Sequence, residues 1–142
     1  MTLNERIASI DGLTGRVHSA AMLSDLLARN ALPQVAPAAF VLPLGFRCSK
    51  PDVSAGLYRQ SIEHLVGVLL VVRSASDATG AAGLVDLDPL IKAVIEKVAG
   101  WVPGEDAIGE YFCVRGELVG MPAGTLLYQL DFAIEDQLRI TT

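Results

Sequence analysis

The last stretch of the chain, Thr125 to Thr141, alternates apolar and polar side chains over most of its length. One face is apolar except for Asp136, and the other face is mostly polar or charged. The apolar set is Leu126, Tyr128, Leu130, Phe132, Ile134, Leu138 and Ile140. A period of two predicts an antiparallel strand with one face on a core. Because strands usually have about 5–6 residues, we expect part of this one to leave the domain or to serve a neighbouring subunit.

A second long strand is predicted from Leu57 to Arg73. Its outer half alternates, with Ile62 between Ser61 and Glu63, whereas its inner half, Leu65 to Val72, is apolar on both faces. An apolar run of this kind is typical of a strand at the centre of a sheet. We therefore expect the inner half to be buried and the outer half to project.

The interval from Gly45 to Gly56 has two glycines, a proline and charged residues without any periodicity. It predicts a loop of about a dozen residues, a length that is usually functional or disordered. The preceding run, Pro37 to Leu44, is short and apolar, as expected of a strand buried on both faces. Pro43 cannot donate to a ladder, so we expect it near the strand end or at an edge position.

Apolar residues recur at the helical period between Leu87 and Val98. Asp88 and Pro89 suit the N-cap and N1 positions of this helix, and Gly100 suits its C-terminal stop. A start near residue 83 or 84 fits the pattern as well. The helix is followed by Trp101, which we expect to close the junction between helix and sheet.

Shorter elements complete the pattern. Helices are predicted at Thr2 to Ser9, with the spacing of a capping box, and at Ala21 to Arg29. Strands are predicted at Arg16 to Ala20 and at Tyr111 to Leu118. The order predicts an α+β fold, a single domain over residues 1–142, in which helices pack on a mainly antiparallel sheet with long projecting strands and one long loop.

Composition limits the class of partner. Hydrophobic residues make up 51% and charged residues 19% of the chain, which favours apolar surface covered by partner subunits. The net charge is −5 and the basic residues form no cluster, which disfavours nucleic acid. The run from Leu65 to Val72 is much shorter than the about 20 residues of a membrane span. With Asn4, Glu5 and Arg6 near its start, the chain predicts no export signal, and so a cytoplasmic protein unless it travels in an assembly.

Side chains with catalytic or metal-binding chemistry are few and scattered. His18 and His64 lie on predicted strands without a partner in a catalytic spacing, and Glu63 faces away from His64 because strand neighbours point to opposite sides. Cys48 and Cys113 lack a CxxC spacing, which favours reduced thiols. The sequence therefore predicts no enzyme, no cofactor and no metal site.

Five segments, in their order and spacing, carry a resemblance to a known family. They are Pro37–Gly45, then Val66–Arg73 followed by Asp77–Ala82, then Gly100-Trp101-x-Pro103, and then Leu126–Ala133. In that order they resemble the tail terminator proteins of long-tailed bacteriophages. The chain departs from this family at residues 127–129, which read Leu-Tyr-Gln where such proteins often have Trp-Trp-Gln.

The resemblance implies a small α+β subunit that assembles, usually as a hexameric ring, on the last ring of the tail tube. Such a subunit stops tube polymerisation and presents a surface to the head-side connector. The implied partners are copies of itself, the tail tube protein and a connector or neck protein. The implied location is the head-proximal end of the virion tail, after assembly in the host cytoplasm. Two alternatives stay open: another neck adaptor protein, and a small cytoplasmic dimeric α+β domain that binds a ligand.

Contacts between subunits, or between ring and tube, are expected at the outer parts of the long strands, Leu57 to Glu63 and Glu135 to Ile140, and at the predicted loop. Charged residues of these segments are expected to form ion pairs at the rim that set register rather than affinity. The set consists of Arg59, Glu63, Glu135 and Arg139. Arg47 and Lys50 of the predicted loop are further candidate interface residues.

Overall fold

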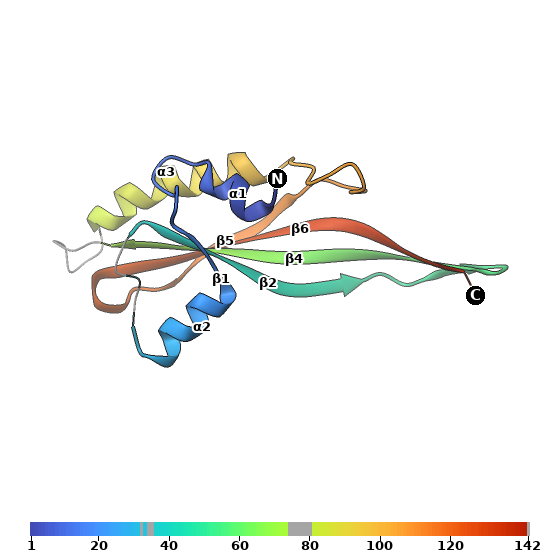
Figure 1. Ribbon diagram of the computed structural model, residues 1–142, viewed down its shortest axis with the longest axis horizontal. Coiled ribbons are helices and arrows are strands. Elements are labelled where there is room, and N and C mark those ends of the chain that lie inside the picture. Colours follow the sequence, from blue (N-terminus) through green and yellow to red (C-terminus); the bar gives the residue numbers. More distant parts are fainter. Residues whose placement is uncertain (32, 34–35, 74–80, 142) are drawn as a thin grey trace.

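The computed structural model describes residues 1–31, 33, 36–73 and 81–141 and shows one sheet with helices on both faces (Figure 1). The helices are α1 (Leu3–Ala8), α2 (Ala20–Ala28) and α3 (Ala81–Val98). The strands are β1 (Val17–Ser19), β2 (Ala38–Cys48), β3 (Asp52–Ser54), β4 (Leu57–Arg73), β5 (Phe112–Gly120) and β6 (Thr125–Thr141). A 3₁₀ turn at Pro122–Gly124 joins β5 to β6. The predicted α+β class is confirmed.

The six strands follow the order β1-β2-β4-β6-β5, and β3 pairs with the outer end of β4. β1 is parallel to β2 and the other neighbours are antiparallel, so the sheet is mixed. β4 and β6 pair over their whole length, from Leu57 opposite Thr141 to Arg73 opposite Thr125. Both long strands are therefore confirmed, and β4 lies at the centre of the sheet as predicted.

The inner part of the sheet is buried on both faces. On one face Val68 and Leu70 of β4 pack in a cluster with residues of α1 and α3. On the other face Leu69 and Val71 pack with Leu26 of α2, which Figure 1 shows on the opposite side of the sheet. Successive strand residues point to opposite faces. Two covered faces therefore explain why this part of β4 is apolar at every position.

The N-terminal segment and the end of α3 are joined by aromatic and cationic side chains. α1 has the predicted capping box, in which the Glu5 backbone N–H donates to Thr2 Oγ1 at 3.1 Å. The Arg6 guanidinium lies 5.1 Å from the centre of the Trp101 ring, and that ring stacks on Tyr111 at 5.8 Å. Trp101 therefore closes the junction between helix and sheet.

The start of α3 differs from the favoured prediction. The helix begins at Ala81, so Asp88 and Pro89 lie inside it and are not its N-cap and N1 residues. A proline inside a helix costs about 3 kcal/mol, and here Leu87 and Leu90 beside it are buried against the sheet and hold the turn in place. The predicted stop at Gly100 is confirmed by its φ of 82°.

The interval Gly45 to Gly56 is not the long loop that was predicted. β2 continues through it to Cys48, and after residues 49–51 β3 pairs with β4 and leads into it through a short turn. The register shifts between Pro43 and Gly45, where Gly45 has a φ of 106° that glycine adopts without strain. This bulge breaks the alternation, so the sequence pattern conceals the strand. Pro43 lies on β2 beyond the end of β1, at an edge position as expected.

Beyond the helices the sheet continues as a narrow ribbon (Figure 1). We call it the outer ribbon and define it as residues 46–65 and 133–141. In it, β4 pairs with β2 and β3 on one side and with β6 on the other. Because Leu57 lies opposite Thr141, the turn between β3 and β4 and the end of β6 lie together at the tip.

Candidate subunit interface

The charged residues selected from the sequence all lie on the outer ribbon. They come from several separate segments: Arg47 on β2, Lys50 after it, Arg59 and Glu63 on β4, and Glu135 and Arg139 on β6. Directly opposite residues on neighbouring strands point to the same side of a sheet. The strand registers therefore place the five residues of the set other than Lys50 on one face, which we call the charged face.

Like charges lie opposite each other on this face. Arg59 is the partner of Arg139, and Glu63 is the partner of Glu135, in the ladder between β4 and β6. Opposite residues have Cβ atoms about 4.5–5.5 Å apart, and like charges in such positions destabilise a sheet. The arrangement therefore requires opposite charges nearby.

The β2 and β3 side supplies opposite charges to β4. Arg47 forms an ion pair with Glu63, and Arg59 Nη2 lies 3.3 Å from Asp52 Oδ2. Asp52 is not among the residues selected from the sequence, because it lies in the interval predicted to be a loop. The sequence feature that could have revealed this pair is the short turn at Ala55-Gly56, which places Asp52 opposite Arg59 in a hairpin.

Within the residues that the structure describes, no opposite charge of this kind lies beside the charges of β6 on this face. Among the residues that the structure describes, no ion pair includes Glu135 or Arg139, and both are exposed. The Arg139 Nε instead donates to Gln137 Oε1 at 2.6 Å, which orients the guanidinium on the charged face. These two β6 charges are therefore available to another molecule.

The other face of the outer ribbon is mainly apolar, and its polar residues are Gln60 and one polar pair. Phe46 is 64% exposed and Ile140 is 44% exposed. His64 Nε2 lies 3.6 Å from Asp136 Oδ2, which accounts for the single acidic residue that interrupts the apolar alternation of β6. His64 and Glu63 face opposite sides, as expected, since Glu63 belongs to the charged face.

The strand β5 forms the opposite edge of the sheet and is exposed from Phe112 to Val119. Phe112, Val114, Leu118 and Val119 are large apolar residues with at least two fifths of their surface exposed. A long apolar edge strand is a surface that pairs readily with another chain. It is thus a second candidate contact surface, on the side of the sheet away from β2.

Next to β5, a polar cluster lies on the inner sheet. The Asp131 carboxylate is nearly buried and accepts hydrogen bonds from Arg115 Nε at 3.0 Å and from Gln129 Nε2 at 2.8 Å. The bond to Asp131 raises the pKa of Arg115 above its usual value. Gly67 leaves room for this cluster, since a Cβ there would lie 3.2 Å from Gln129 Nε2. The cluster is satisfied within the chain and fixes β5 against β6.

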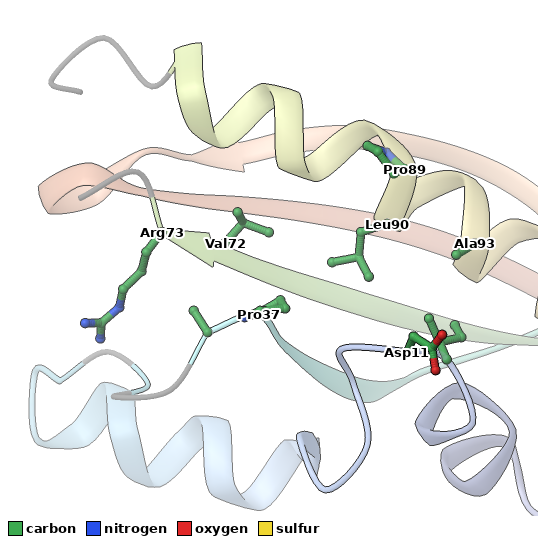
Figure 2. A pocket seen from close by; sticks show the side chains of 9 residues that line it. Asp11, Pro37, Val72, Arg73, Pro89, Leu90 and Ala93 are labelled. Carbon is green, nitrogen blue, oxygen red and sulfur yellow. The ribbon is translucent and has the colours of Figure 1, made fainter. Parts of the chain in front are cut away.

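A hollow of about 390 Å³ lies between α3 and the sheet, lined mainly by apolar groups such as Val72 and Leu90 (Figure 2). Figure 2 shows Arg73 and Asp11 at opposite ends of it, and Arg73 donates to the backbone oxygen of Pro33. Ligand sites combine apolar walls with a few polar groups that converge. Because these charged groups diverge, the hollow does not support the ligand-binding alternative.

Other chemistry is limited within the described residues. In these residues no group of three or more side chains that could hold a metal comes together, and no helix is long and apolar enough to cross a membrane. Cys48 and Cys113 are free thiols. Burial and the nearby Asp131 carboxylate raise the pKa of the Cys113 thiol, which lowers its reactivity at neutral pH.

Together, the mixed sheet and its exposed edges define a protein whose prominent surface features suit contacts with other chains. The family model of the phage tail terminator protein matches residues 5–142, nearly the whole chain. The chain belongs to the phage tail terminator family, which is a family of structural virion proteins and not of enzymes. Membership implies a location in the virion tail and interaction with other tail or virion proteins. No curated protein matches the chain.

Proposed function

We propose that this protein forms a ring, hexameric in the assembled tail, at the head-proximal end of the tail tube. There it stops tube polymerisation and presents a surface to the head connector or neck protein. Membership of the phage tail terminator family supports a structural role in the tail. The observation that supports a ring is that the two edges of the sheet expose different surfaces.

A ring needs two such surfaces because its contacts are head-to-tail, so each subunit offers one patch to one neighbour and a different patch to the other. The β2 and β3 edge of the outer ribbon lies on one side of β4. The β6 edge of the outer ribbon and β5 lie on the other side. Neither edge is a copy of the other, which suits a closed ring better than a two-fold dimer.

The apolar face of the outer ribbon is the surface we assign to the tail tube. Phe46 and Ile140 lie on it, and aromatic and apolar residues of this kind contribute most to buried contacts between proteins. The partners in this proposal are further copies of the chain, the tail tube protein and the connector or neck protein. The subunit assembles in the host cytoplasm and remains in the virion.

The test combines the solution mass from light scattering with negative-stain images of tail tube protein polymerising with and without this protein. Rings, or monomers that form one capping ring at a tube end and shorten the tubes, support the proposal. A stable dimer that leaves tube length unchanged contradicts it and favours a ligand-binding domain. A ring that binds the connector but leaves tube growth unchanged identifies a neck adaptor instead.

A further inference from the structure

We propose that the open β6 edge of each subunit lies beside the open edge formed by β2 and β3 of the next subunit. The register places Glu135 beside Arg47 of the partner subunit and Arg139 beside the partner's Asp52. This inference rests on the proposed ring and specifies the surface, the register and the ion pairs that close it.

Both edges are free of strand partners within the described part of the chain. β1 pairs with β2 only at Ala39, Phe40 and Val41, so β2 beyond Val41 and all of β3 have a strand on one side only. β5 pairs with β6 no further than Ala133, and a Cβ at Gly109 would lie 3.5 Å from the backbone oxygen of Glu135, so the β6 edge is open only from Asp136 to its end. The Glu135 side chain itself is exposed on the charged face. Unpaired edges are templates for pairing with another chain.

The registers on the two sides of β4 define two levels across the outer ribbon. At the first level Glu63 lies between Arg47 on β2 and Glu135 on β6, so the charges run plus, minus, minus. At the second level Arg59 lies between Asp52 on β3 and Arg139 on β6, so the charges run minus, plus, plus. The two levels are opposite in sign at every strand.

Cyclic symmetry brings these levels into contact. β2 and β6 both run antiparallel to β4, so they are parallel to each other, and a neighbour placed at the same height presents its β2 and β3 edge to β6. At the first level Glu135 then meets the partner's Arg47, and at the second level Arg139 meets the partner's Asp52. Each like-charge contact between β4 and β6 then has an opposite charge beside it.

The same pattern rejects other registers. A shift that moves one level onto the other places Glu135 beside Asp52 of the partner subunit, or Arg139 beside the partner's Arg47, and like charges then meet at the seam. Charge complementarity of this kind selects partner and register more than it adds affinity. Two competing arrangements also satisfy the charges. One is a two-fold dimer of β6 edges, with Gln137 on the axis and Glu135 beside the partner's Arg139, and the other is a two-fold dimer of the β2 and β3 edges, with Arg47 beside the partner's Asp52.

Two charge-reversed variants separate these arrangements. In the proposed seam, Glu135→Arg and Arg47→Glu each create like-charge contacts, so each variant alone should form rings about tenfold less than the unaltered protein, or less still, at low salt. Mixed in equal amounts, they should form rings in which the two variants alternate, because both mixed seams pair opposite charges. Glu96→Arg on α3 makes the same charge change as Glu135→Arg away from the ribbon, and it should leave ring formation unchanged.

Other outcomes overturn the inference. If Arg47→Glu assembles normally while Glu135→Arg does not, the contact is the two-fold dimer of β6 edges, and the converse result identifies the two-fold dimer of the β2 and β3 edges. If both variants form rings alone, the seam lies elsewhere, although the proposed function stands. If the unaltered protein forms no ring even at tube ends, the proposed function fails and the inference fails with it. Circular dichroism and thermal melting of each variant show that loss of assembly does not come from loss of folding.

A cysteine pair tests the register without changing any charge. Ser49 and Gln137 lie at the level between the two charged ones, since both are aligned with Ser61. In a background with Cys48 and Cys113 replaced by serine, Ser49→Cys combined with Gln137→Cys should give on oxidation a ladder of covalent oligomers that ends at the ring. Neither single cysteine should cross-link. Dimers from Gln137→Cys alone would show the two-fold arrangement of β6 edges, dimers from Ser49→Cys alone would show that of the β2 and β3 edges, and either result would overturn the inference.

Discussion

The strands β4 and β6 pass through two regions that share one hydrogen-bonded ladder but differ in the burial and the chemistry of their side chains. In the inner region, side chains such as Val68 and Phe132 are fully buried between helices and sheet. In the outer ribbon, one face carries charges and the other carries exposed apolar groups such as Phe46. Burial of apolar surface is the main favourable term in folding. We therefore expect the stability of the subunit to come from the inner region, and we propose that the outer ribbon serves assembly.

The largest effect should separate two phenylalanines, one in each region. Phe132→Ala removes a fully buried ring and should lower the free energy of unfolding by about 3–5 kcal/mol. Phe46→Ala removes a ring that is 64% exposed and should change the free energy of unfolding by about 0.5 kcal/mol or less. Urea unfolding measures both. The same Phe46 variant should cap tail tubes poorly, and normal capping would show that the apolar face is not the tube contact.

A second prediction concerns how tightly the edge strand β5 packs against the inner region. A Cβ at Gly116 on β5 would lie 2.8 Å from Leu130 Cδ2 and 3.1 Å from Tyr128 Cε1. Since Leu130 is buried, Gly116→Ala should force a shift of the packed side chains and cost about 1–3 kcal/mol. Gly104→Ala is the matched control, because a Cβ there meets nothing within 4 Å. Equal melting temperatures for the two variants would contradict tight packing at β5.

The two regions also differ in how well the sequence predicts them. β4 and β6 are predicted with their observed bounds because a period of two is a local property of the chain. The strand hidden between Gly45 and Gly56 is missed because a bulge moves its side chains out of phase. The start of α3 is misplaced because Asp88 and Pro89 imitate a helix start, whereas tertiary packing keeps the proline inside.

The candidate interface is predictable in its members but not in its pairings. Charges on the outer halves of two long strands indicate a surface, and the strand registers place Arg59, Glu63, Glu135 and Arg139 on one face of it, although their role in an interface stays a prediction. That Arg59 lies opposite Arg139 follows from the register between β4 and β6, which joins residues far apart in the chain. Neither strand alone specifies that register. The ion pair between Arg59 and Asp52 can be predicted only if the hairpin that joins β3 to β4 is also predicted.

A third effect concerns the charged face. Arg47→Ala and Arg59→Ala each remove an ion pair whose arginine is substantially exposed, so each should lower the free energy of unfolding by about 1 kcal/mol or less. Thermal and urea unfolding of the two variants measure this cost. A loss above about 2 kcal/mol would mean that the pairs stabilise the subunit itself, and the division between a stabilising inner region and an assembling ribbon would then be wrong.

The smallest effect is a change in pH dependence at the border of the two regions. Burial, and then the Asp131 carboxylate, raise the pKa of Cys113 in the folded protein. Its contribution to stability is therefore complete below the unfolded thiol pKa of about 8.5 and is lost as the pH rises through the raised folded value. In a Cys48→Ser background, Asp131→Asn removes the smaller of the two causes, so the alkylation rate of Cys113 should rise at pH 8 and its pH midpoint should move down. The two proteins should alkylate equally in urea, and an unchanged midpoint in the folded protein would show that the carboxylate does not act on the thiol.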